Sequence, residues 1–332
     1  MKKMEIIAEV AQGYEGNKYQ ARLLAKSAIL SGAQSVKFQL IYVNEISTRE
    51  YKYYNLFKSL EMPLVEWKII SQIVHKSKRK LYFDIYGNKS LAIAKKVLAD
   101  GVKISTTEFY NWSLIVKAIK NFKKIFISIG GIEMKKIDRL YNYIVENKQN
   151  KKVCFLYGFQ SEPAKINQSN LLKIKTFKER YNKIEIGFMD HTCGSNEEAL
   201  YLSLILLGMN VTTIEKHITL DRVLQIEDYI SGLSPEKFKA FVNIINFYKK
   251  ALGSASINKL TKHEKEYHNK AAKMVVANKN LKKNTIIKLK DISLKRTDAK
   301  IVGKPIRYLE NLIGKKLKKN IAKDKPILLN YI

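Results

Sequence analysis

The sequence has little of several features that would define a protein class at once. It contains only two cysteines, Cys154 and Cys193, and five prolines in 332 residues. Two cysteines supply neither a disulfide framework nor the ligand spacing of a zinc site. No apolar run reaches the ~20 residues of a membrane-spanning helix, so we expect no membrane partner. The amino terminus also lacks the apolar segment of a signal peptide, which predicts a cytoplasmic protein.

Acidic residues are scarce relative to basic ones. The chain has 30 Asp and Glu against 61 Lys and Arg, and its formal net charge is +31. Such a balance is typical of nucleic-acid-binding proteins. However, the lysines are spread over the whole length, and few patches combine arginine with aromatic residues. We therefore interpret the charge as a solvated surface that attracts small anions, and we expect no nucleic-acid partner.

Short β-branched runs alternate with amphipathic segments through the first 250 residues. The expected strands are 5–10, 35–39, 80–85, 101–105, 124–128, 153–157, 184–188 and 211–215. The expected helices are 18–31, 64–78, 89–98, 111–121, 133–147, 169–180, 195–207 and 235–251. Eight strand–helix units in about 250 residues predict a (β/α)8 TIM barrel, an α/β fold. A doubly wound sheet is the alternative, but Gly13-Tyr14-Glu15-Gly16 does not supply its glycine fingerprint.

The pattern changes after residue 255. We expect a TIM-barrel domain over 1–255, a polar linker with some helix over 256–273, and a small β-rich domain over 274–332. A domain of about 60 residues is close to the lower size limit for independent folding. Packing against the barrel or against a second subunit would therefore help it.

Polar residues gather where the expected strands end, and these ends meet at one mouth of such a barrel. Read in chain order, they are Glu9, Lys37, Gln39, Asp84, Lys103, Thr106, Glu108, Ser128, Gln160, Asp190, His191, Glu215, Lys216 and His217. Two imidazoles from successive strands, His191 and His217, predict a site for a divalent cation such as Mn²⁺, Mg²⁺ or Co²⁺. Two lysines with nearby hydroxyls suit a phosphate, although each lysine alone is as consistent with a surface residue.

Two carboxylates of this rim, Glu9 and Asp190, are the candidate catalytic groups. Glu9 is either a general base that positions water or one half of an ion pair with a neighbouring lysine. We predict Asp190 as the second catalytic residue and Gln160 as a substrate contact.

Four motifs in order resemble the signatures of the N-acetylneuraminate (sialic acid) synthase family. They are Ile7-Ala8-Glu9-Val10, Gly32-Ala33-Gln34-Ser35-Val36-Lys37-Phe38-Gln39, Gly187-Phe188-Met189-Asp190-His191-Thr192-Cys193-Gly194 and Ile214-Glu215-Lys216-His217-Ile218-Thr219-Leu220-Asp221-Arg222. The tail, with Leu294-Lys295-Arg296 and Leu312-Ile313-Gly314-Lys315-Lys316, is similar to that family's antifreeze-like (SAF) domain.

The resemblance implies a metal-dependent condensation of phosphoenolpyruvate with an N-acetylated hexose, an amino-sugar acceptor. It makes His191 and His217 the metal ligands and places Glu9 beside the reacting centre. It further implies that the phosphate is held by Lys37, Lys103, Thr106 and Ser128, and the sugar by Gln39. Arg296 would reach the sugar from a partner subunit, which implies a domain-swapped homodimer.

Some positions depart from the family pattern. Met189 stands where a serine is usual, Glu162 where an aromatic residue is common, and Tyr229 where a histidine usually follows Asp228. These departures concern the acceptor rather than the reaction class. The alternatives are another phosphoenolpyruvate-dependent keto-sugar-acid synthase and a non-catalytic barrel that binds an anionic sugar.

Overall fold

Eight parallel strands close into a barrel, which confirms the predicted fold class. The computed structural model describes residues 4–159, 161, 163–297 and 303–332. In strand order β1 to β8 each strand pairs with the next and β8 pairs with β1. Their bounds are Glu5–Ala11, Ser35–Gln39, Lys80–Ile85, Gly101–Ile104, Ile125–Ser128, Val153–Tyr157, Glu185–Asp190 and Thr213–His217.

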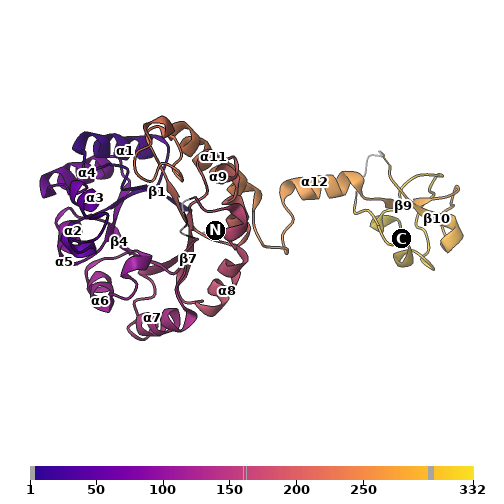
Figure 1. Ribbon diagram of the computed structural model, residues 1–332. Coiled ribbons are helices and arrows are strands. Elements are labelled where there is room, and N and C mark those ends of the chain that lie inside the picture. Colours follow the sequence, from indigo (N-terminus) through magenta and orange to yellow (C-terminus); the bar gives the residue numbers. More distant parts are fainter. Residues whose placement is uncertain (1–3, 160, 162, 298–302) are drawn as a thin grey trace. The chain divides into compact units, whose positions relative to one another are not determined.

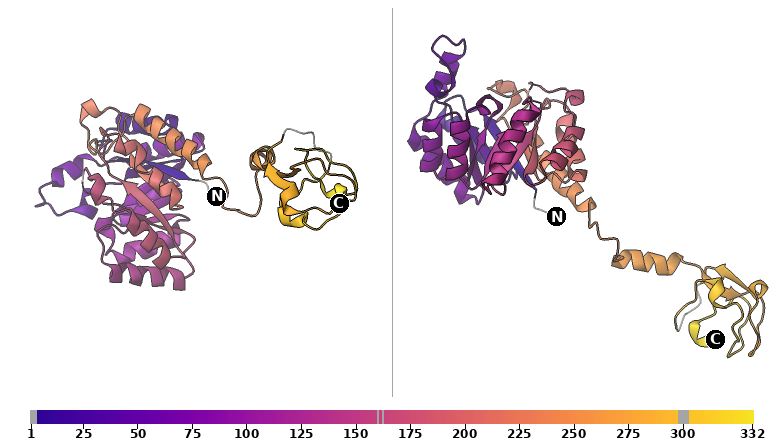
Figure 2. Two further views of the ribbon diagram at one scale, coloured as in Figure 1. Left: turned by 90° about the vertical axis from the view of Figure 1, so that its right-hand side faces the viewer. Right: turned by 90° about the horizontal axis from the view of Figure 1, so that it is seen from below.

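Helices surround this ring of strands (Figure 1). They are α1 Lys18–Leu30, α4 Leu64–Lys76, α5 Asn88–Lys96, α6 Trp112–Asn121, α7 Met134–Glu146, α8 Leu172–Arg180, α9 Glu198–Tyr201, α10 Leu204–Gly208 and α11 Pro235–Ala251. Two short helices, α2 Val43–Ile46 and α3 Tyr54–Ser59, were not expected and lie in the connection from β2 to α4. Figure 2 shows this purple segment standing out from the barrel.

The expected helix over 195–207 is divided into α9 and α10. In the sequence, Ser195 with Glu198 three residues later fits the pattern of a capping box, but this prediction is wrong, because α9 begins at Glu198 and its N-cap residue is Glu197. The Ser195 hydroxyl instead contacts Asn196 and Cys193. By contrast, Ser234-Pro235 fits the pattern of an N-cap followed by proline, and the structure confirms it: Ser234 accepts a bond from the Lys237 amide, and Pro235 takes the first position of α11.

The buried residues form two layers in the barrel. Alternate strand residues face outward and pack against the helices in one large cluster, for example Phe38, Phe83, Ile127 and Phe155. The residues between them fill the interior in a separate cluster of Ile7, Tyr82, Phe126, Cys154, Leu156 and Met189. Because side chains alternate along a strand, the residues next to an interior residue point outward, and those two positions away point into the barrel.

The chain divides into two compact units, Met1–Gly253 and Ser254–Ile332. The second unit holds α12, Lys262–Ala271, and an antiparallel pair of β9, Met274–Ala277, with β10, Ile292–Lys295. Its core consists of Val275, Ala277, Leu281, Ile287, Ile292, Ile306, Leu312, Leu317, Ile321 and Ile327. No helix within the described ranges is long and apolar enough to cross a membrane.

Candidate active site

A charged layer lies directly above the apolar interior, toward the carboxyl ends of the strands. Glu9 and Asp84 are each two positions after a residue of the apolar interior. Lys37 pairs with Glu9 and Lys103 with Asp84 across neighbouring strands, and Glu215 pairs with the interior residue Ile7. The layer consists of Glu9 on β1, Lys37 on β2, Asp84 on β3, Lys103 on β4 and Glu215 on β8. All five side chains are at most 5% exposed.

The two lysines of this layer are held by three carboxylates. The Lys37 Nζ contacts Glu9, lies 2.6 Å from Asp84 Oδ1 and 3.5 Å from Glu215 Oε2. The Lys103 Nζ lies 2.6 Å from Glu215 Oε1 and 3.6 Å from Asp84 Oδ2. The lysines are therefore core residues, which excludes the alternative that they are surface residues of a lysine-rich chain.

Burial and charge act in opposite directions on these groups. Burial lowers the pKa of Lys37 to about 8, although Asp84 and Glu215 oppose the change, so the ammonium stays charged at neutral pH. Burial also disfavours the charged form of Lys103, but Asp84 and Glu215 outweigh it and raise the pKa. Both lysines in turn lower the pKa of Glu215 against the effect of burial. Three carboxylates against two ammonium groups give the cluster a net charge of −1 when all are ionised.

The two histidines lie together beside this cluster. Their ring centroids are 5.1 Å apart and the ring planes are inclined by 55°. Burial, with Lys103 adding to it, lowers the pKa of His191 to about 4. Burial and the neighbouring His191 hold the pKa of His217 well below its usual range. Both rings are therefore neutral at pH 7, which is the form that binds a metal.

The donor set fits a divalent cation only in part. Each ring has a buried Nδ1 for which the described residues supply no hydrogen-bond partner. Two orphaned nitrogens on adjacent rings are an unfavourable arrangement unless a ligand satisfies them. In the part of the chain that the structure describes, no group of three His, Cys, Asp or Glu side chains is arranged to hold a metal. The two imidazoles would therefore leave the remaining positions to water or substrate oxygens, as catalytic sites do.

Glu9 owes its position to a bulge in β1. The pairing with β2 runs in register to Glu9 and Lys37 and then shifts by one residue, so that Ala11 pairs with Phe38. Ala11 has a left-handed backbone with φ of 50°, and its amide donates to Glu9 Oε1 at 2.6 Å. Bulges frequently re-aim a side chain next to an active site. Here the bulge fixes one Glu9 oxygen while the other contacts Lys37.

The prediction of Asp190 as a catalytic residue does not agree with its position. Met189 belongs to the interior cluster, so the next residue on β7 faces the opposite side. The Asp190 carboxylate contacts Lys216 at 3.0 Å and accepts a hydrogen bond from Ser203 in the outer layer. It therefore lies behind the site, not in it. Sequence neighbours on a strand cannot both face the lumen.

The remaining predicted contacts fall in three places. Ser128 is buried inside the barrel, where its hydroxyl lies 3.5 Å from the Met189 sulfur. Gln39 is half-buried at the end of β2 and accepts a hydrogen bond from the Gln12 side chain at 3.0 Å. Thr106 lies half-buried in the 3-10 turn Thr106–Glu108 that follows β4.

Two predicted residues lie elsewhere. Gln160 falls outside the described residues, as does Glu162. Arg296 belongs to the second unit, where its side chain is exposed and its Nε donates to the Ala271 carbonyl at 3.1 Å. Its reach toward a sugar stays a prediction.

Sequence reasoning gave no role to three carboxylates of the site. Asp84 and Glu215 bridge the two lysines, as described above. Asp228 accepts a hydrogen bond from the Gln12 amide at 2.9 Å, and burial raises its pKa to about 6. Asp84 and Glu215 were visible at strand ends in the sequence, but Asp228 lies in a loop and carried no such signal.

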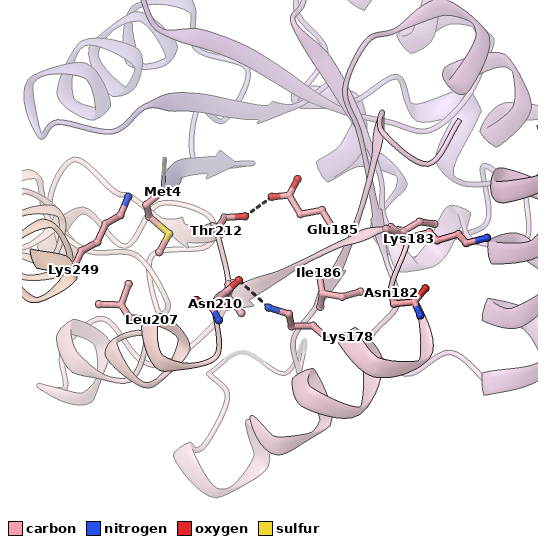
Figure 3. A pocket seen from close by; sticks show the side chains of 12 residues that line it. Met4, Lys178, Asn182, Lys183, Glu185, Ile186, Leu207, Asn210, Thr212 and Lys249 are labelled. Atoms are coloured by element: carbon pink, nitrogen blue, oxygen red, sulfur yellow. Dashed lines mark hydrogen bonds between the residues drawn. The ribbon is translucent and has the colours of Figure 1, made fainter. Parts of the chain in front are cut away.

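A cavity of 390 Å³ lies at the other end of the barrel, among the amino-terminal ends of β7 and β8 (Figure 3). Its polar side chains already serve the fold. Lys178 donates to the carbonyls of Met209 and Asn210 at 2.7 and 2.9 Å. Glu185 accepts from Thr212 at 2.7 Å and pairs with Lys124. This end provides control positions that are remote from the charged layer.

An eight-stranded α/β barrel with charged groups at the carboxyl ends of its strands has the architecture of a TIM-barrel enzyme. The chain belongs to the NeuB family, which it matches over residues 24–257. Residues 272–331 match the SAF domain. Both findings confirm the resemblance that the sequence motifs indicated.

Known relatives extend over nearly the whole chain. N,N'-diacetyllegionaminic acid synthase of Campylobacter jejuni is 29% identical, over 98% of this chain and 99% of that protein. Human N-acetylneuraminate-9-phosphate synthase is 26% identical, over 97% of this chain and 91% of its own length. A solved structure of N-acetylneuraminic acid synthetase from Leptospira borgpetersenii has the same fold, with a TM-score of 0.72 at 23% identity over 81% of this chain and 93% of that one. These three relatives are named as synthases of sialic-type acids.

Proposed function

We propose that this protein condenses phosphoenolpyruvate with an N-acetylated, N-acetylmannosamine-like hexose, with release of phosphate and formation of a nonulosonic acid. The observation that supports the proposal best is the convergence of two lysines, two neutral imidazoles and Glu9 on one barrel mouth. Both lysines are paired with buried carboxylates, and their place at the carboxyl ends of β2 and β4 would also suit an anionic substrate.

The reaction joins C3 of the enolpyruvyl group to the aldehyde carbon of the open-chain sugar. Water adds at C2, and the C2–O bond to the phosphate breaks. The sum is phosphoenolpyruvate, sugar and water on one side, and the keto-sugar acid and phosphate on the other.

The residues of the mouth divide this work. Lys37 and Lys103 neutralise the phosphate and carboxylate of the donor, and the hydroxyls of Ser128 and Thr106 donate hydrogen bonds to it. His191 and His217 would hold a divalent cation, which when bound supplies Lewis-acid polarisation of the sugar aldehyde. Glu9 positions the attacking water and accepts its proton.

Charge balance supports the need for a cation. The cluster of three carboxylates and two ammonium groups is net negative, so alone it would repel an anionic donor. A divalent ion at the histidines changes the net charge of the mouth from −1 to +1. We therefore expect metal and phosphoenolpyruvate to bind cooperatively.

Gln39 would contact the acceptor at the mouth, and Gln160, which falls outside the described residues, is proposed as a substrate contact from the sequence alone. Arg296 would reach the acceptor from the SAF domain of a second copy in a domain-swapped homodimer. Met189, Glu162 and Tyr229 are the residues we expect to distinguish this acceptor from N-acetylmannosamine itself.

The test measures phosphate released from phosphoenolpyruvate in the presence of Mn²⁺ and a panel of 2-acetamido and diacetamido hexoses. We expect release that requires both sugar and metal, and that is lost in His191→Ala and in Lys37→Ala. Lys183→Ala changes an exposed lysine at the opposite end of the barrel and serves as the control. Absence of release with every sugar, in a protein that still binds the sugars, would favour the non-catalytic alternative.

A further inference from the structure

A buried ion pair lies directly behind the two histidines. On β7 the residue before His191 is Asp190, and on β8 the residue before His217 is Lys216. These two residues are paired across the strands in the barrel register. Both side chains are 0% exposed, and the Lys216 Nζ lies 3.0 Å from Asp190 Oδ1.

Every polar atom of this pair is bound within the outer layer. Asp190 accepts bonds from the Thr192 amide and hydroxyl and, at 3.2 Å, from the Ser203 hydroxyl at the N-cap of α10. Lys216 donates to the Thr192 hydroxyl at 2.9 Å and to its carbonyl at 3.3 Å. The network therefore ties both flanks of His191 to β8 and to α10.

Stability alone does not account for this arrangement. Two charges are expensive to bury, and replacing a buried ion pair by apolar residues of similar volume is often neutral or stabilising. The neighbouring outward-facing residues of β7 and β8 are apolar: Phe188 lies two residues before Asp190, and Ile214 two residues before Lys216.

The location of the pair shows what it can do. The register between β7 and β8 runs through Phe188, Met189 and Asp190 and extends no further in the described pairing. In the β7–β8 pairing each histidine is thus the first residue beyond the last pair, although His217 also pairs with Glu9 of β1 on its other side. The ion pair is the last fixed link between the two strands before the imidazoles.

We propose that Asp190 and Lys216 are positioning residues that set the separation of the His191 and His217 rings for a shared divalent cation. The inference rests on the metal site of the proposed function. Neither residue touches the ion, and their contribution is to hold two ligands at one spacing before the ion arrives. Groups that orient metal ligands commonly contribute tenfold to hundredfold in metal affinity.

The test is a titration of the full-length protein with Co²⁺, followed by visible absorption, and with Mn²⁺, followed by electron paramagnetic resonance. The main variant is the double substitution Asp190→Leu with Lys216→Met, which replaces both partners by apolar side chains of similar shape and leaves no unpaired charge. We expect it to fold with wild-type circular dichroism and to bind both ions at least about tenfold more weakly. The Co²⁺ spectrum should also change, because the spacing of the two ligands is altered.

A matched control removes another lysine–carboxylate pair of the same barrel. Lys124 and Glu185 lie 2.7 Å apart at the opposite end of β7, and the double variant Lys124→Met with Glu185→Leu should retain the wild-type affinity. If the main variant does not fold, Ser203→Ala decides instead, since it removes only one bond to Asp190 and should weaken binding about threefold.

The outcomes separate the two proposals. A folded Asp190→Leu, Lys216→Met protein with wild-type affinity and spectrum overturns the positioning role but leaves the metal site intact. We expect His217→Ala to bind neither ion. If the wild-type protein also binds neither ion, the metal site and the positioning role are overturned together. Weaker binding in the main variant with an unchanged control supports the inference.

Discussion

Replacing Lys37 by methionine should be among the most destabilising single changes in this barrel. The ammonium group lies among three buried carboxylates and contacts all of them within 3.5 Å. Lys37→Met keeps an unbranched side chain, one atom shorter, and removes the charge. Glu9, Asp84 and Glu215 are then left with Lys103 alone, and the net charge of the cluster falls from −1 to −2.

The magnitude follows from the burial of the partners. Removing one partner of a buried ion pair usually costs about 3–5 kcal/mol, because a buried charge is left uncompensated. Lys103 remains 3.6 Å from Asp84 and compensates part of this loss. We therefore expect a decrease of about 3 kcal/mol in the free energy of unfolding at pH 7.

The loss should depend on pH with a definite sign. Without Lys37, repulsion among the carboxylates raises the folded-state pKa of at least one of them above its unfolded value. A raised pKa favours the folded state at low pH, and this contribution disappears as pH rises through the raised value. The difference between Lys37→Met and wild type should therefore be smaller at pH 5 than at pH 7.

Urea denaturation followed by circular dichroism measures both quantities. Lys124→Met, at the other end of the barrel, is a control in which one ammonium group is also removed but only from one carboxylate. A Lys37→Met protein that loses less than about 1 kcal/mol at both pH values would refute the claim of an uncompensated buried cluster.

Four further outcomes are expected. His217→Ala should abolish Co²⁺ absorption while leaving the free energy of unfolding within about 1 kcal/mol of wild type, and persistent absorption would contradict the ligand assignment. Phosphoenolpyruvate should bind more tightly with Mn²⁺ present, which calorimetry can measure; equal affinity with and without the ion would contradict the charge argument. Although burial opposes it, Lys124 and two threonine hydroxyls lower the pKa of Glu185 to about 2. The ionised Glu185 therefore stabilises the fold by up to about 3 kcal/mol above pH 4.5, and this stabilisation is lost as pH falls toward 2. In an acid titration of stability, Glu185→Gln should lack this pH-dependent loss. Met189→Ser should lower the free energy of unfolding by about 2–4 kcal/mol, since it empties space in the barrel interior, and unchanged stability in urea would place the side chain outside it.

Local sequence patterns determined where the strands of this barrel lie. Runs such as 35–39 and 80–85 are short, β-branched or aromatic, and bounded by polar turns, so each was placed to the residue. The same patterns identified His191, His217, Lys37 and Lys103 as groups at strand ends. Local patterns failed at 195–207, where α9 and α10, separated by Leu202 and Ser203, replace the single expected helix.

Only the closed barrel determined which side chains at the strand ends contact one another. Glu9 and Glu215 are distant in the chain and meet because β1 pairs with β8, which turns isolated lysines into members of one buried cluster. The tertiary structure also separated Asp190 from His191, because adjacent residues of a strand take opposite faces and only one face is the lumen. The place of a strand along the chain depends on local sequence. The burial, the pKa and the contacts of a side chain depend on which strands the closed barrel brings together.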